Sequence, residues 1–193
     1  MKNILNKNGL TFVELLTASI VTGVVMLGVA SMDISLRNAY EGTSKGTMVA
    51  SKAAALMHHI SRRILEASGS PTDPGVVIAS SPDRLYIRSD TPQTPSTYAD
   101  DVWHVYQYNS GTDTLSYCTT TNSTTNCQAT VQSFPNIVLF EPTLLNNSAT
   151  YQFAISVKIT SLYDSSQAVD TLRNPEYTVT STFNLPSSSS TIP

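Results

Sequence analysis

A long apolar run opens the hydrophobic pattern of this chain. Residues 10–32 form a stretch of 23 positions, and no charged side chain occurs between Leu15 and Met32. A helix of this length is about 35 Å long, which is enough to cross the hydrocarbon core of a bilayer. Because lipid offers no partner for open backbone groups, the run predicts one transmembrane helix.

Beyond that run, apolar residues continue at helical spacing while most charged residues take other faces. The apolar positions are Val49, Ala53, Leu56, Met57, Ile60, Ile64 and Leu65. Residues 67–71 combine Ser, Gly and Pro, a stop signal, so we expect the helix to end near Ala67. Residues 41–47 contain two glycines and three hydroxyl side chains. This composition has low helix propensity and predicts a bend or a loosened turn.

After residue 71 the spacing changes to the alternation that is typical of β-strands. About five or six segments show it, at residues 85–88, 102–108, 114–117, 137–140, 151–159 and 176–185. Strands without helices between them favour an α+β fold, in which a long N-terminal helix packs on an antiparallel β-sheet. We expect transmembrane and extracytoplasmic helix halves at residues 10–32 and 33–68, a β-rich globular domain at 69–185 and a disordered tail at 186–193.

The charge pattern orients the helix and limits the partners. Residues 1–9 are basic through Lys2 and Lys7 and contain no acid, which places the N-terminus in the cytoplasm and the C-terminal part outside. From residue 67 onward, four Lys or Arg stand against ten Asp or Glu, a balance of −6. Binding to phosphates needs the opposite sign, so we expect no direct contact with nucleic acid.

Two simple interpretations of the apolar run stay open. A secretory signal peptide has an apolar region of about 7–15 residues, shorter than this one, although Ala30-Ser31-Met32 imitates a cleavage site. A plain membrane anchor explains the length of the run but not Glu14, which lies near its front edge. A lone charge in lipid costs about 2.5–3.5 kcal/mol or more, so we expect Glu14 to have a partner.

The residues around Glu14 resemble a known signal. The matching run, which follows the short basic leader, is Gly9-Leu10-Thr11-Phe12-Val13-Glu14-Leu15-Leu16. It is similar to the class III signal of type IV prepilins and pseudopilins, although that family usually has Phe where this chain has Leu10. The resemblance implies a pilin-like fold, a leader peptide at residues 1–9 and cleavage between Gly9 and Leu10 by a membrane-embedded prepilin peptidase. It also implies N-methylation of Leu10 and pairing of Glu14 with the terminal amine of a neighbouring subunit.

The two cysteines indicate a structural bridge. Cys118 and Cys127 bracket eight residues, none of them apolar. In an oxidising compartment, a disulfide closing this loop contributes about 2–3 kcal/mol. A metal site is disfavoured, because only His104 lies near in sequence and no C-x-x-C motif is present.

Other candidates for chemistry are few. His58 and His59 are adjacent, so a helix points them about 100° apart, which favours a surface or packing role over shared metal binding. The pair Asp100-Asp101 is a weak candidate for calcium. No phosphate-binding loop, nucleophile elbow or His–carboxylate arrangement is visible, so we expect neither catalysis nor a cofactor.

These expectations combine into a structural role. Through the resemblance, the chain is expected to be a minor pilin that primes or caps a type IV pilus-like filament. Its partners would be other pilins or pseudopilins, the prepilin peptidase and methyltransferase, and inner-membrane lipid. It would stand in the inner membrane with its C-terminus outside the cytoplasm, and then in a periplasmic or cell-surface filament. A minor pseudopilin of type II secretion and a membrane-anchored adhesin or binding module remain the alternatives.

Overall fold

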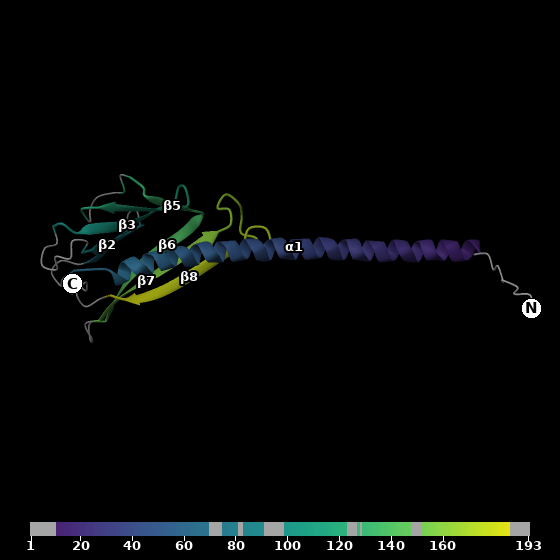
Figure 1. Cartoon of the computed structure of the whole chain (residues 1–193), viewed down its shortest axis with the longest axis horizontal. Coiled ribbons are helices and arrows are strands. Elements are labelled where there is room, and N and C mark those ends of the chain that lie inside the picture. The colour runs from purple at the N-terminus through teal and green to yellow at the C-terminus, as the bar shows by residue number, and fades with distance from the viewer. Residues whose placement is uncertain are drawn as a thin grey trace, which may run out of the picture. The chain divides into compact units, whose positions relative to one another are not determined.

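The computed structural model describes residues 11–69, 75–80, 83–90, 99–122, 127, 129–147 and 152–185. Gly9 and Leu10, which flank the expected cleavage point, lie outside the described residues, as does the expected tail at 186–193. The chain divides into two compact units, Met1–Glu41 and Gly42–Pro193. One helix, α1 (Phe12–Leu65), begins in the first unit and ends in the second (Figure 1).

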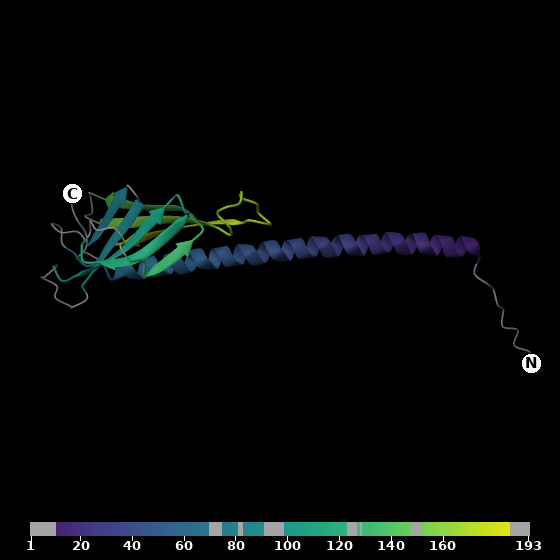
Figure 2. The same ribbon diagram turned by 90° about the horizontal axis from the view of Figure 1, so that it is seen from above.

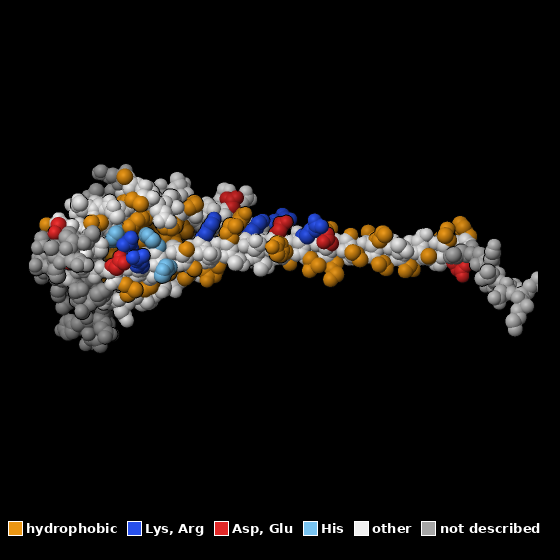
Figure 3. Space-filling model, in the orientation of Figure 1, with side chains coloured by type: hydrophobic (Ala, Val, Ile, Leu, Met, Phe, Trp, Pro, Cys, Tyr) orange, Lys and Arg blue, Asp and Glu red, His pale blue; other side chains and the backbone are white. Residues whose placement is uncertain are grey.

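The first unit exposes the apolar part of α1. By length and composition, α1 is a candidate membrane-spanning helix. Its large apolar side chains from Phe12 to Leu36 are exposed, and hydrophobic side chains recur along this part of the helix in Figure 3. Most hydroxyl groups here bond back to a carbonyl three or four residues earlier, for example Ser19 Oγ to Leu15 O at 2.8 Å and Thr22 Oγ1 to Ala18 O at 2.8 Å. These hydroxyls are therefore satisfied within the helix, as an apolar solvent requires.

Within the described residues, eight strands form two antiparallel sheets in the second unit. The first sheet has the order β1 (Val76–Ser80), β2 (Asp83–Ser89), β3 (Val102–Asn109), β4 (Thr114–Thr120) and β5 (Gln132–Pro135). The second has the order β6 (Ile137–Asn147), β7 (Gln152–Leu162) and β8 (Glu176–Asn184). Every described pairing of named strands is antiparallel, which confirms the α+β class.

The prediction of one sheet is wrong, because the strands form two sheets and the chain passes from the first to the second at one residue. Asn136 lies between β5 and β6 with a φ of 64°, in the left-handed region that Asn tolerates better than most residues. Its Nδ2 donates to the carbonyl of Tyr163 at 2.9 Å, which fixes the turn. Strands β1 and β5 were not predicted: β1 is short, and β5 contains a proline and little alternation.

The core of the second unit joins α1 to both sheets. From the helix, the expected residues Val49, Ala53, Leu56, Met57, Ile60 and Ile64 are buried, which confirms their periodicity, whereas Leu65 is exposed. Ile155, Val157 and Ile159 of β7 face the same core, together with Leu85 and Ile87 of β2. Figures 1 and 2 show the strands against one side of this part of the helix.

The helix ends at Leu65, close to the expected position, and the chain then joins the first sheet. Ala67 forms a bridge with Ser89, and the N–H of Ser68 donates to the carbonyl of Arg88 at 3.0 Å. The Arg88 side chain in turn donates from Nε to the carbonyl of Ser68 at 3.1 Å. At the helix end itself, the carbonyls of Arg62 and Ile64 accept the N–H groups of Glu66 and Ala67, each at 3.2 Å.

The loosened turn expected at residues 41–47 is absent, because this whole segment is helical. Gly42 is buried, and a Cβ at this position would lie 3.1 Å from the Cα of Leu172 in the connection between β7 and β8. Lys45 Nζ donates to the carbonyl of Arg173 at 3.4 Å and lies 5.2 Å from the centre of the Tyr163 ring. Tertiary contact thus overrides the weak intrinsic propensity.

Candidate functional site

The candidate site is the first turn of α1, which Thr11 and Glu14 close. The carbonyl of Thr11 accepts the N–H of Leu15 at 3.1 Å, which makes Thr11 the N-cap of the helix. Glu14 Oε2 accepts both the N–H and the hydroxyl of Thr11, each at 2.8 Å. In return, the N–H of Glu14 donates to Thr11 Oγ1 at 3.3 Å. This reciprocal arrangement is a capping box.

Thr11 is therefore a partner of Glu14 within the same chain, and the sequence analysis did not predict it. The signal was visible, because Thr11 and Glu14 have the T-x-x-E spacing of the motif. The box gives Glu14 a structural role within its own chain, whatever else the carboxylate does. Its charge also lies at the positive end of the helix dipole, which favours an anion there.

The two carboxylate oxygens of Glu14 differ in their surroundings. Both bonds from Thr11 end on Oε2, and Oε1 has no partner among the residues that the structure describes. The side chain is exposed. Glu14 can therefore cap its own helix through Oε2 and accept a hydrogen bond from a cationic group of another molecule through Oε1.

The bonds of the box do not involve residues 1–9. The N–H of Thr11 belongs to the peptide bond with Leu10, so cleavage between Gly9 and Leu10 would leave that donor in place. The Thr11 hydroxyl is likewise retained. After such a cleavage, an amine on Leu10 would stand one residue before the N-cap.

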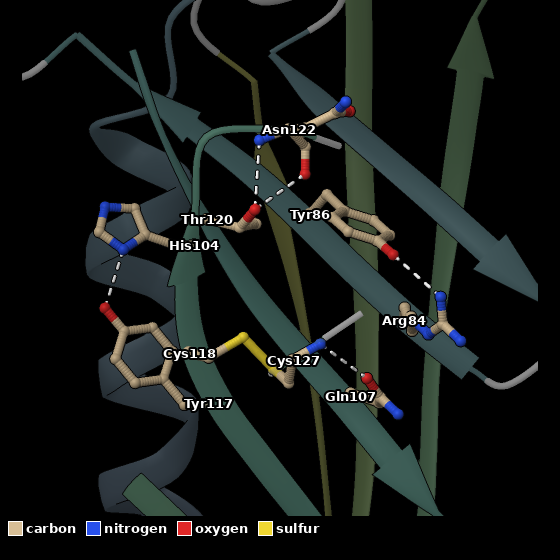
Figure 4. Close-up of a disulfide and its surroundings, with 9 residues drawn as sticks. All are labelled: Arg84, Tyr86, His104, Gln107, Tyr117, Cys118, Thr120, Asn122 and Cys127. Atoms are coloured by element: carbon tan, nitrogen blue, oxygen red, sulfur yellow. Dashed lines mark hydrogen bonds between the residues drawn. A yellow bond between two sulfur atoms is a disulfide. The ribbon is translucent and has the colours of Figure 1, made fainter. Parts of the chain in front are cut away.

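The disulfide expected between Cys118 and Cys127 is confirmed, with the two Cα atoms 5.7 Å apart. Cys118 packs with Tyr86, Trp103 and Val105 on the face of the first sheet that lies away from α1. The N–H of Cys127 donates to Gln107 Oε1 at 3.3 Å, so β3 also holds the second cysteine (Figure 4). This bridge anchors a loop and leaves no free thiol.

A hydrogen-bonded aromatic cluster joins α1 to the first sheet. His59 Nδ1 lies 2.7 Å from Tyr106 Oη, and the ring of His59 lies 4.8 Å from that of Tyr117. His104 bonds to Tyr117 Oη through Nδ1 at 2.8 Å and to Ser89 Oγ through Nε2 at 2.9 Å. His59 thus packs against the first sheet, as the sequence favoured, whereas His58 is exposed.

Burial sets the protonation of this cluster. Loss of hydration lowers the pKa of His104 to about 4, and the nearby positive charge of Arg63 acts in the same direction. The pKa of His59 is lowered for the same two reasons, and burial raises the pKa of Tyr106. The three groups are therefore neutral at pH 7 and behave as a polar part of the core.

The acidic pair considered for calcium is split between surface and interior. Asp100 is exposed, whereas Asp101 is only 2% exposed and pairs with the buried Arg88, whose Nε lies 3.3 Å from Asp101 Oδ2. The guanidinium of Arg88 also lies 5.3 Å from the centre of the Trp103 ring. Within the described part of the chain, no group of three or more His, Cys, Asp or Glu is placed to hold a metal ion.

Comparison of the chain with models of protein families, with curated proteins and with solved structures gave no match.

Proposed function

We propose that this chain is a membrane-anchored subunit of a type IV pilus-like filament. In this role, α1 anchors the subunit in the inner membrane and later packs beside other helices. The strands of the second unit, here called the β unit, stay outside the cytoplasm. The observation that carries the proposal is Glu14 in the first turn of an exposed apolar helix, with no bond to Oε1 from any residue that the structure describes. The sequence from Gly9 to Leu16, with its prepilin-like pattern, supplies the identity of that partner.

The electrostatics of the first turn support an amine as the partner. A carboxylate in lipid is costly, and two hydrogen bonds from Thr11 offset that cost only in part. A terminal ammonium of a neighbouring subunit would neutralise the charge in a layer of low dielectric constant. Such pairing sets the axial position of one helix against the next, which is what a filament requires.

The finer assignment follows the size and layout of the chain. A long helix followed by a β unit of eight strands is in keeping with a minor pilin that primes or caps assembly. The same pairing chemistry would serve a minor pseudopilin of type II secretion. A membrane-anchored adhesin would use the β unit for binding and would be indifferent to the charge of Glu14.

The test separates the capping role of Glu14 from its pairing role. Glu14→Gln keeps an oxygen for the capping box, which accepts Gln as well as Glu, but removes the charge. We expect Glu14→Gln to lower the share of the chain in sheared filaments roughly tenfold or more, because a charge-assisted bond is lost. The readout is the ratio of filament-bound to membrane-bound chain.

Two matched controls complete the experiment. Thr11→Ala removes the capping hydroxyl and retains the charge of Glu14, so incorporation should stay within about twofold of the wild type. Asp33→Asn removes an exposed acid of the same helix, paired with Arg37 at 2.9 Å, and should also assemble. If Glu14→Gln assembles normally while Thr11→Ala fails, Glu14 serves capping alone and the pairing proposal is wrong.

A further inference from the structure

The connection between β7 and β8, residues 163–175, is held in its conformation by hydrogen bonds within the loop. Asn174 is only 4% exposed, and its Nδ2 donates to the carbonyls of Asp164, Gln167 and Ala168 at 2.9, 3.0 and 3.1 Å. Its Oδ1 accepts the N–H of Asp164 at 2.8 Å. One buried amide thus holds the loop closed, so the loop acts as a preformed body.

An acidic side chain, Asp170, fixes the tip of this loop. Asp170 Oδ1 accepts the N–H groups of Leu172 and Arg173 at 2.8 and 2.9 Å. The backbones of Asp170 and Asn174 also exchange two hydrogen bonds, at 2.9 and 3.0 Å. The turn between them places Leu172 against Gly42 of α1 and the carbonyl of Arg173 against Lys45.

The helical segment beneath the loop is the one that its composition least supports. Residues 42–47 include Gly42 and Gly46, which favour the unfolded chain, and a Cβ on Gly46 would meet nothing within 4 Å. Of these six residues only Gly42 is buried, and it is buried where Leu172 covers it. The segment also follows directly on the boundary between the two compact units.

We propose that the loop of residues 163–175 is a clasp that keeps residues 42–47 helical. When the clasp lifts, these residues unwind and become a flexible joint within α1. The joint lets the apolar part of the helix change partners, between lipid and other chains, without disturbing the core that begins at Val49. The proposal goes beyond the filament role and holds for any membrane-anchored form of the chain.

Hydrogen exchange of the full chain in detergent micelles tests the clasp. In Leu172→Ala we expect amides 43–47 to exchange roughly threefold faster or more, because the cover on Gly42 is removed. Amides 53–64 of the same helix should keep their wild-type rates. Val169→Ala, at an exposed position of the same loop, is the matched control and should change neither group.

Two further variants keep the test independent of a damaged loop. Lys45→Ala retains a good helix former but loses the contacts to Arg173 and Tyr163, so it should speed the same amides. Adding Gly46→Ala to Leu172→Ala should restore slow exchange, since alanine favours the helix where there is open space. Unchanged exchange at 43–47 in both single variants overturns the clasp, and so does an equal acceleration at 53–64.

Discussion

Gly42 and Leu172 meet so closely that no side chain larger than hydrogen fits between their backbones without a shift. An ideal Cβ on Gly42 would lie 3.1 Å from Leu172 Cα and 3.2 Å from Leu172 O. Because these are largely backbone atoms, they give way less readily than the end of a flexible side chain. The contact explains why a glycine stands inside a helix at this point.

A pair of glycine substitutions measures that contact. Gly46→Ala should stabilise the second unit by about 0.5–1 kcal/mol, because alanine favours the helix and meets nothing within 4 Å. Gly42→Ala gains the same propensity but must push Leu172 away, so it should be less stable than Gly46→Ala by about 1 kcal/mol or more. Denaturant unfolding of the full chain in detergent gives both values. Equal stabilisation by the two variants would contradict the close contact.

The buried ion pair between Arg88 and Asp101 should be sensitive to loss of one member. Asp101→Ala leaves the guanidinium of Arg88 in the core without its carboxylate, which should cost roughly 3–5 kcal/mol of unfolding free energy. Asp100→Ala, at the exposed neighbour, should change stability by less than about 0.5 kcal/mol. Similar losses in the two variants would show that the pair has no special role.

The disulfide should contribute to the stability of the second unit. Replacing both Cys118 and Cys127 with alanine removes the constraint on the unfolded chain, so we expect a loss of about 2–3 kcal/mol. Chemical reduction of the wild-type chain should produce a loss of the same size. No change in the unfolding midpoint under either treatment would rule out a stabilising role.

Acid should weaken the second unit through His104. Its pKa is about 4 in the folded chain and near 6.5 when exposed, so below pH 6.5 the unfolded chain binds more protons than the folded one. The contribution of neutral His104 is therefore complete above pH 6.5 and is lost as the pH falls toward 4, on the order of 3 kcal/mol in all.

A pair of histidine variants isolates this effect. His104→Gln keeps polar atoms in the site but does not titrate, so unfolding free energy measured from pH 7.5 to 4 should show a shallower slope than in the wild type. His58→Gln, at an exposed position, should keep the wild-type slope. If His104→Gln and the wild type lose stability in parallel, another group carries the pH dependence.

Sequence reasoning was most successful where one periodic pattern faced one core. The spacing from Val49 to Ile64 and the alternation in β7 both predicted the buried faces. An element that is buried on one side has apolar residues at a regular spacing along its sequence. The alternation in β3 likewise placed Tyr106 and Trp103 on opposite faces of the sheet, in two separate clusters.

What escaped prediction depended on contacts between distant segments. The change of sheet at Asn136 involves a single residue, and its partner Tyr163 lies 27 positions further on. The helical state of residues 42–47 depends on contact with Leu172, and helix propensities, which are local, do not include such a contact. The capping box, by contrast, is local, and its T-x-x-E spacing is visible in the sequence. The prediction for Glu14 considered its charge in lipid and not its place as the third residue of a helix.

The mass of the mature N-terminal peptide, from chain purified out of membranes, tests the filament proposal most directly. Pairing with Glu14 requires a chain that begins at Leu10 with a free amine, and the resemblance to prepilins predicts one added methyl group on that amine. A chain that still carries residues 1–9, or one that starts beyond Met32, would leave Glu14 without the amine that the proposal assigns to it.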